Sequence, residues 1–196
     1  MSNNMSCTEV ERYVKSKVKP KRFLHCVSVA ETAVYLNSRF NTELDKDDCY
    51  KCGLLHDIAR NWQAGDLLLY TKEHSIKLEK EEVHHPVLLH APVGASIAKH
   101  MGFEEYETAI RWHTLGNKDM GKLGAIIYLA DYLEPRRGFL TDEQRVSYIK
   151  MESIEVICLN VLKQMKHHFK DNALSFATST QGLYDYLKEG GTFWKR

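Results

Sequence analysis

A histidine and an aspartate stand side by side in an apolar stretch, GLLHDIAR at positions 53–60. The spacing of apolar residues around it predicts a helix that begins among the acids at positions 45–48 and runs to about Arg60. Because an unpaired buried charge is costly, His56 and Asp57 need compensating partners in such a helix. One divalent metal would satisfy both, since neutral imidazole and carboxylate oxygen are good ligands for iron, manganese or zinc. The alternative is a hydrogen-bonded core histidine beside a surface aspartate.

The rest of the chain also has helical rather than alternating apolar spacing, and it contains only four prolines. We therefore predict an all-α fold with no convincing strand, and one domain spanning residues 1–196. A capping box of Ser6 and Glu9 should start the first helix. The other expected helices cover about 21–40, 63–72, 91–100, 104–114, 122–133, 141–169 and 179–189, with a polar irregular segment at 75–86 and a loop at 116–121.

Composition narrows the classes of function. The formal net charge is +1, which argues against a nucleic-acid-binding domain, since such domains carry a basic field. No apolar run is long enough to span a membrane, and the N-terminal residues do not have the pattern of a secretory signal. The five cysteines are odd in number and irregularly spaced, so a disulfide framework is not expected. These features predict a cytoplasmic protein.

Further ionisable residues lie inside or at the ends of the predicted apolar helices. They are His25, His90, His113 and Asp131, and the aspartate lies in the most apolar helix of the chain. Each of them alone has an ordinary structural explanation. Together with the His-Asp pair, they match the way helical bundles place metal ligands from several helices at one focus.

The order of these residues resembles the HD domain of metal-dependent phosphohydrolases. Flanking residues sharpen the likeness to the YqeK branch of that family, whose members are bacterial symmetrical dinucleoside-tetraphosphate hydrolases. The matching motifs are RFLH at 22–25, GLLHDIAR at 53–60, HAPVGA at 90–95, AIRWHTLG at 109–116 and IYLADYLEPRR at 127–137. The resemblance extends from about residue 21 to residue 187, with the HD motif core at about 21–135, and implies a helical bundle.

The resemblance also implies site residues. His25, His56, Asp57 and Asp131 are expected to hold a divalent metal, with His90 and His113 completing a second metal site or touching substrate phosphates. Iron is the expected metal, manganese is an alternative, and the centre could be dinuclear. The residues expected to take part directly in catalysis are His56, Asp57 and Asp131.

A polyphosphate substrate needs cations as well, and three arginines lie close in sequence to the proposed ligands. Surface charge is the alternative for each of them. Thr178 and Thr180 lie in the loop expected to hold the nucleotide base, although Thr180 could simply cap the last helix. The residues expected to contact substrate are Arg22, His25, Asp57, Arg60, His90, His113, Thr114, Asp131, Arg137, Thr178 and Thr180.

The implied activity is symmetrical cleavage of diadenosine tetraphosphate to two ADP, by metal-hydroxide attack on an inner phosphate. Two alternatives remain open at this point. One is another HD phosphohydrolase, acting on a mononucleotide or guanosine tetraphosphate. The other is a nucleotide-binding HD module without catalysis. The implied partner in each case is a nucleotide, with neither nucleic acid nor membrane involved.

The apolar stretch from Trp62 to Tyr70 could form a surface for a homodimer. Packing of this stretch into the core is the alternative, and the pattern favours it.

Overall fold

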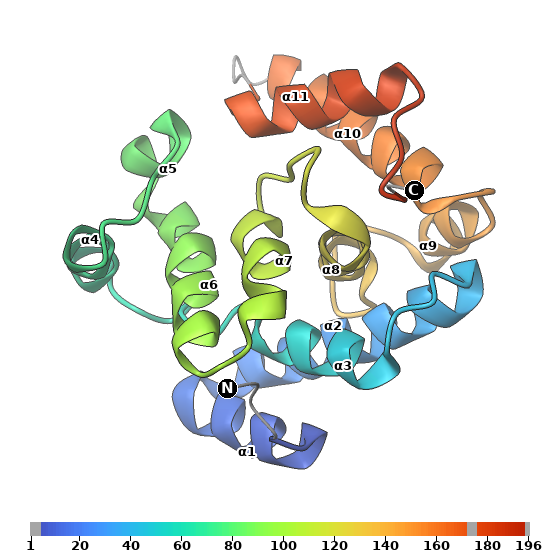
Figure 1. Cartoon of the computed structure of the whole chain (residues 1–196). Helices are drawn as coiled ribbons and strands as arrows, with labels where there is room; N and C mark the ends of the chain where they lie inside the picture. The colour runs from blue at the N-terminus through green and yellow to red at the C-terminus, as the bar shows by residue number, and fades with distance from the viewer. Residues whose placement is uncertain (1–4, 172–175, 195–196) are drawn as a thin grey trace.

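The computed structural model describes residues 5–171 and 176–194, without the side chains of 168–171. Residues 1–4, which contribute to the expectation about a signal peptide, lie outside these ranges. The described ranges are helical and contain no β-strand, which confirms the all-α prediction (Figure 1). The helices are α1 (Cys7–Lys17), α2 (Pro20–Phe40), α3 (Lys46–Leu55), α4 (Ala64–Glu73), α5 (Lys80–His84), α6 (His90–His100), α7 (Glu107–Trp112), α8 (Gly121–Leu133), α9 (Asp142–Ile149), α10 (Ile154–Asp171) and α11 (Thr178–Lys188), with short 3-10 helices η1 (Pro86–Leu89) and η2 (Glu104–Tyr106).

Helices α2 and α3 pack with their backbones in contact at Gly53. A Cβ atom added there would lie 2.6 Å from the Cα of Ala30, closer than real atoms approach. Helix α8 packs against α2, α3 and α7, and α6 packs against α7. Figure 1 shows α6, α7 and α8 standing next to one another above α2 and α3. This arrangement directs the ends of several helices toward one region of the core.

The predicted start of the first helix is confirmed. The Ser6 hydroxyl accepts the backbone N–H of Glu9 at 3.3 Å, and the Glu9 carboxylate accepts the N–H of Ser6 at 2.8 Å. This reciprocal capping satisfies N–H groups that have no partner inside the helix.

The third helix is shorter than predicted, because α3 ends at Leu55. The chain continues in tight turns, in which the N–H groups of Ile58 and Arg60 bond to carbonyls three residues earlier, at 3.0 and 2.9 Å. Neighbouring side chains in an α-helix point about 100° apart. The end of the helix therefore allows His56 and Asp57 to turn toward the same place.

The segment 75–86 is not irregular throughout, because it contains α5. The carboxylate of Glu82 accepts the N–H of Glu79 at 2.8 Å, and the two residues cap the helix reciprocally. Glu82 is fully buried and forms a two-pronged ion pair with Arg111 of α7, at 2.6 and 2.8 Å. This helix thus depends on a partner in a distant part of the sequence.

The helix predicted at 141–169 is two helices, since α9 ends at Ile149 and α10 begins at Ile154. Thr141, the first residue of the predicted range, is the N-cap of α9. The Ser153 hydroxyl accepts the N–H three residues later, at 3.3 Å. Serine is a favoured residue at the start of a helix, and apolar spacing alone does not reveal that a new helix begins here.

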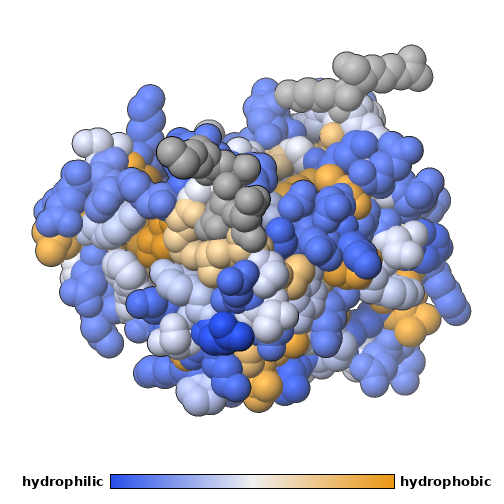
Figure 2. Space-filling model, turned by 60° about the horizontal axis from the view of Figure 1, so that its bottom comes forward, coloured by the Kyte–Doolittle hydropathy of each residue, from blue (hydrophilic) through white to orange (hydrophobic). Residues whose placement is uncertain are grey.

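The apolar stretch 62–70 is divided between core and surface. Leu67 is buried with Ala59, Leu89 and Val93, whereas Leu69 is 56% exposed. The homodimer stays a prediction. Figure 2 shows a largely hydrophilic face on which apolar residues form small groups. No helix in the described part of the chain is long and apolar enough to cross a membrane.

Candidate metal centre

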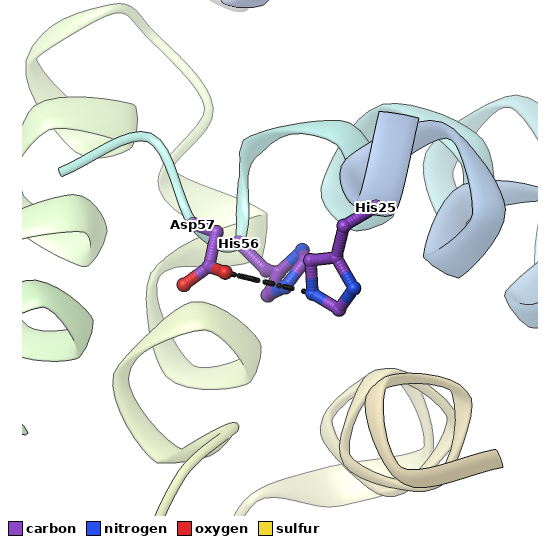
Figure 3. A group of neighbouring side chains, drawn as sticks. All are labelled: His25, His56 and Asp57. Carbon is purple, nitrogen blue, oxygen red and sulfur yellow. Dashed lines mark ion pairs between the residues drawn. The ribbon is translucent and has the colours of Figure 1, made fainter. Parts of the chain in front are cut away.

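Six predicted ligands come together at the ends and inner faces of five segments. His25 comes from α2, and His56 and Asp57 follow α3, so residues far apart in sequence meet (Figure 3). His90 is the first residue of α6, and His113 follows α7, which ends at Trp112 rather than at the predicted Thr114. Asp131 lies in the last turns of α8.

The carboxylate of Asp57 lies at the centre of four histidines. Its Oδ1 is 3.1 Å from Nε2 of His90 and 3.6 Å from Nε2 of His113. Its Oδ2 is 3.5 Å from Nε2 of both His25 and His56. Figure 3 shows this carboxylate directed toward the imidazoles of His25 and His56. All five side chains are buried, so they face one another rather than water.

Asp131 completes the cluster from α8. Its Oδ1 is 3.0 Å from Nε2 of His25 and 3.7 Å from Nε2 of His56. Potential ligand atoms lie within 4.8 Å of one another in three overlapping groups, each of which holds at least three residues. The groups are His25, His56 and Asp57; His56, His113 and Asp131; and Asp57, His90 and His113.

The hydrogen bonds of three histidines define which ring nitrogen faces the centre. Nδ1 of His56, His90 and His113 each bonds the backbone carbonyl three residues earlier in the chain. A carbonyl only accepts, so Nδ1 carries a proton, and in the neutral ring Nε2 then presents its lone pair to the centre. The Nε2 atoms of His90 and His113 are 3.2 Å apart, and both face the Asp57 carboxylate. Nitrogen atoms and a carboxylate that converge in this way suit a shared proton or a metal ion between them.

Buried polar atoms without hydrogen bonds support the same conclusion. In the described residues, Nε2 of His25, Nε2 of His56 and Oδ1 of Asp57 are buried and form no hydrogen bond. Leaving such atoms unsatisfied is costly. Imidazole nitrogen and carboxylate oxygen are the donor types that bind divalent transition metals. The residues present therefore fit a divalent metal.

His25 differs from the other three histidines because its Nδ1 bonds a side chain. Nδ1 lies 3.0 Å from Oε1 of Glu134, which is 1% exposed and follows α8. The other oxygen of Glu134 accepts the backbone N–H of Arg136 at 2.6 Å. A carboxylate behind a metal-binding histidine holds its tautomer and orientation. Our sequence reasoning did not assign this role, although Glu134 lies within the 127–137 motif.

The surroundings keep both aspartates ionised. Burial raises the pKa of Asp57, but the neighbouring histidines, with His56 first, outweigh it and hold the pKa well below its usual value. Burial also raises the pKa of Asp131, but the neighbouring His25, His56 and Arg137 outweigh it and lower the pKa overall. Burial lowers the pKa of His25, but the carboxylates of Asp131 and Glu134 beside its two ring nitrogens raise it overall. The carboxylates are thus ready to act as ligands.

Two of the three predicted arginines lie at the cluster. Nη1 of Arg22 is 2.7 Å from Oδ2 of Asp57, and Arg137 donates to the backbone carbonyl of Asp131 at 2.8 Å and also contacts its carboxylate. The guanidinium of Arg60 forms no hydrogen bond or ion pair with any described residue. The structure therefore does not bring Arg60 into contact with the cluster.

The three threonines predicted to contact substrate lie in different surroundings. Thr114 follows His113, and its buried hydroxyl forms no hydrogen bond within the described residues. Thr180 does not cap the last helix, because α11 begins at Thr178 and the Thr180 hydroxyl instead donates to the carbonyl of Leu115 at 2.7 Å. Thr178 is exposed. The Thr180 contact joins α11 to the turn that carries His113.

The all-α fold and this histidine–aspartate cluster define a class of helical hydrolases. The family model for the HD domain matches residues 22–136, and the chain belongs to this family. The chain is an HD-domain phosphohydrolase, which confirms the predicted family and the prediction of an enzyme.

Two relatives carry the name "Bis(5'-nucleosyl)-tetraphosphatase, symmetrical". The protein from Staphylococcus aureus is 33% identical over 149 residues, which cover 68% of this chain and 69% of the relative. The protein from Bacillus subtilis is 29% identical over 182 residues, which cover 88% of this chain and 96% of the relative. A crystal structure from Clostridium acetobutylicum, described as a predicted HD superfamily hydrolase involved in NAD metabolism, has a TM-score of 0.84 and 27% identity and covers 95% of this chain and 98% of its own.

Proposed function

We propose that the chain hydrolyses diadenosine tetraphosphate symmetrically, so that one substrate and one water give two ADP. The observation that carries the proposal is the Asp57 carboxylate with Nε2 atoms of four histidines around it. The names of the two symmetrical tetraphosphatase relatives support the choice of substrate.

We assign the metal to the predicted ligands, with iron as the first candidate and manganese as the second. The three overlapping groups of potential ligand atoms support a centre of one or two ions. When bound, divalent ions would polarise phosphoryl oxygens and make water a nucleophile at neutral pH. The ligands would be His25, His56, Asp57, His90, His113 and Asp131, with catalysis depending most on His56, Asp57 and Asp131.

The other residues bind and orient the substrate. Arg22 and Arg137 are partly exposed at the rim of the cluster, and their guanidinium groups can bind phosphoryl oxygens with two hydrogen bonds each. Thr114 offers, beside His113, a hydroxyl that has no hydrogen-bond partner within residues 5–171 and 176–194. Thr178 and Thr180 keep a proposed role near the base, although the Thr180 hydroxyl already has a backbone partner.

One incubation tests the proposal. The purified chain is supplied with Fe²⁺ or Mn²⁺, then with chelator, and mixed with diadenosine tetraphosphate, and the products are separated by anion exchange. We expect two ADP as the product. We expect no product when chelator is added or when Asp57 is replaced by asparagine. Asp66→Asn is the matched control, because Asp66 is exposed on α4. ATP plus AMP would refute symmetrical cleavage. Turnover of a mononucleotide or guanosine tetraphosphate alone, or binding without turnover, would favour the alternatives.

A further inference from the structure

A cavity of about 620 Å³ adjoins the metal centre on the side of His25. His25 and Glu134 line it, together with the start of α2 and the residues that follow α8. Its volume falls within the range of about 300–1,000 Å³ that is usual for small-molecule sites. A ligand in this cavity would therefore lie directly beside the proposed reaction centre.

The lining of this cavity has an excess of positive charge. Arg22 and Arg137 also line it, but they are engaged with the carboxylates of the cluster. Lys19, Lys21 and Arg136 are exposed, and their side chains form no hydrogen bond or ion pair with other described residues. Three uncompensated cations thus line one cavity of a chain whose net charge is only +1. They attract an anion with several charges.

The carboxylate of Glu134 does not neutralise these cations, although it lines the same cavity. It is buried, and its two oxygens bond the imidazole of His25 and the backbone N–H of Arg136. Both oxygens of Glu134 are therefore already hydrogen-bonded, and Glu134 forms no ion pair with the three exposed cations. These cations remain free to bind an anionic ligand.

The backbone adds to the same field. Lys19 is the N-cap residue of α2, and no side chain caps this helix end. Uncapped N–H groups and the helix dipole favour anions there. The backbone N–H of Lys19 donates to Oδ1 of Asn61 at 2.8 Å, which ties the start of α2 to the turns after Asp57. The backbone that carries Lys19 and Lys21 is therefore anchored beside the cavity.

We propose that this cavity binds the second diphosphate group of the substrate, and that Lys19, Lys21 and Arg136 determine the preference for a long phosphate chain. The inference rests on the proposed function. Cleavage at the middle of a tetraphosphate leaves a diphosphate on each side of the reacting bond. One diphosphate can bind at the metal centre and at Arg22 and Arg137. The other diphosphate needs cations that have no other partner, and Lys19, Lys21 and Arg136 provide them. A mononucleotide has no second diphosphate to occupy this cavity.

The test combines binding with kinetics. Lys19→Gln, Lys21→Gln and Arg136→Gln are combined in one variant. A matched control combines Lys72→Gln, Lys150→Gln and Lys188→Gln, which are exposed lysines that do not line the cavity. Equilibrium dialysis on the metal-loaded chain measures the affinity for α,β-methylene-ADP and for AMP. Steady-state kinetics measures KM and kcat for diadenosine tetraphosphate.

The cavity variant should bind α,β-methylene-ADP about 3- to 125-fold more weakly, since each of the three exposed ion pairs contributes a factor of about 1.4 to 5. AMP affinity should fall less, and KM should rise more than kcat falls. A cavity variant that matches the control, or that loses AMP and α,β-methylene-ADP affinity equally, would overturn the inference. The dialysis requires no hydrolysis, so a selective loss there would support a diphosphate site even if the tetraphosphatase assay failed.

Discussion

The contact between Glu134 and His25 yields the most direct prediction about the metal centre. Replacing Glu134 by alanine removes the acceptor 3.0 Å from Nδ1 of His25. The imidazole is then free to rotate or to carry its proton on Nε2, where it could no longer bind a metal. Losing such a partner typically weakens metal binding by about 10–100-fold. We expect this loss for Glu134→Ala, which corresponds to about 1.4–2.8 kcal/mol.

The magnitude agrees with the local structure. Glu134 is 1% exposed, so water does not replace the lost acceptor well. A hydrogen bond to a charged group contributes about 1.5–3 kcal/mol. Glu134→Gln keeps an acceptor oxygen for His25 but loses the charge, so it should bind metal more tightly than Glu134→Ala and less tightly than the unaltered chain.

Competition with a coloured chelator measures the affinity for Mn²⁺, independently of any catalytic activity. Glu189→Ala is the control, because Glu189 is an exposed glutamate after α11. Thermal unfolding of the metal-free variants shows whether they fold, and the glutamine variant preserves the volume if alanine does not fold. Unchanged Mn²⁺ affinity in a folded Glu134→Ala chain would refute the view that Glu134 orients a metal-binding His25.

Three further predictions concern stability. Gly53→Ala should destabilise the fold by about 1–3 kcal/mol in chemical denaturation, because its Cβ would overlap the backbone of Ala30; an unchanged midpoint would contradict the close approach of α2 and α3. Arg111→Met should cost about 3–5 kcal/mol, since it leaves the buried Glu82 carboxylate without its partner. Adding Glu82→Leu should recover much of that loss, and no recovery would argue against the ion pair as the cause. Chelator should lower the unfolding temperature, because metal at 100 times its Kd adds about 2.7 kcal/mol; a chelator-insensitive temperature would contradict tight metal binding in the folded chain.

Local sequence patterns predicted most of the helices correctly. The Ser6–Glu9 capping box and the helix at 122–133 follow from spacing and capping residues, which act over a few positions. The predicted helices were wrong where distant contacts or single capping residues determine whether a helix forms or ends. Helix α5 is joined to α7 by the ion pair between Glu82 and Arg111. The division between α9 and α10 occurs beside Ser153.

The sequence by itself determined the all-α class and the set of groups available for chemistry, because apolar period and residue type are local properties. Ionisable residues in apolar helices singled out all six members of the cluster as candidates, and the resemblance to the HD family assigned them as ligands. Only the tertiary structure decided how they meet: α3 ends at Leu55, which lets Asp57 turn toward four histidines. It also paired His25 with Glu134, 109 positions away, and left Arg60 without a contact to the cluster. These relations depend on the packing of α2 against α3 and α8, which no local pattern encodes.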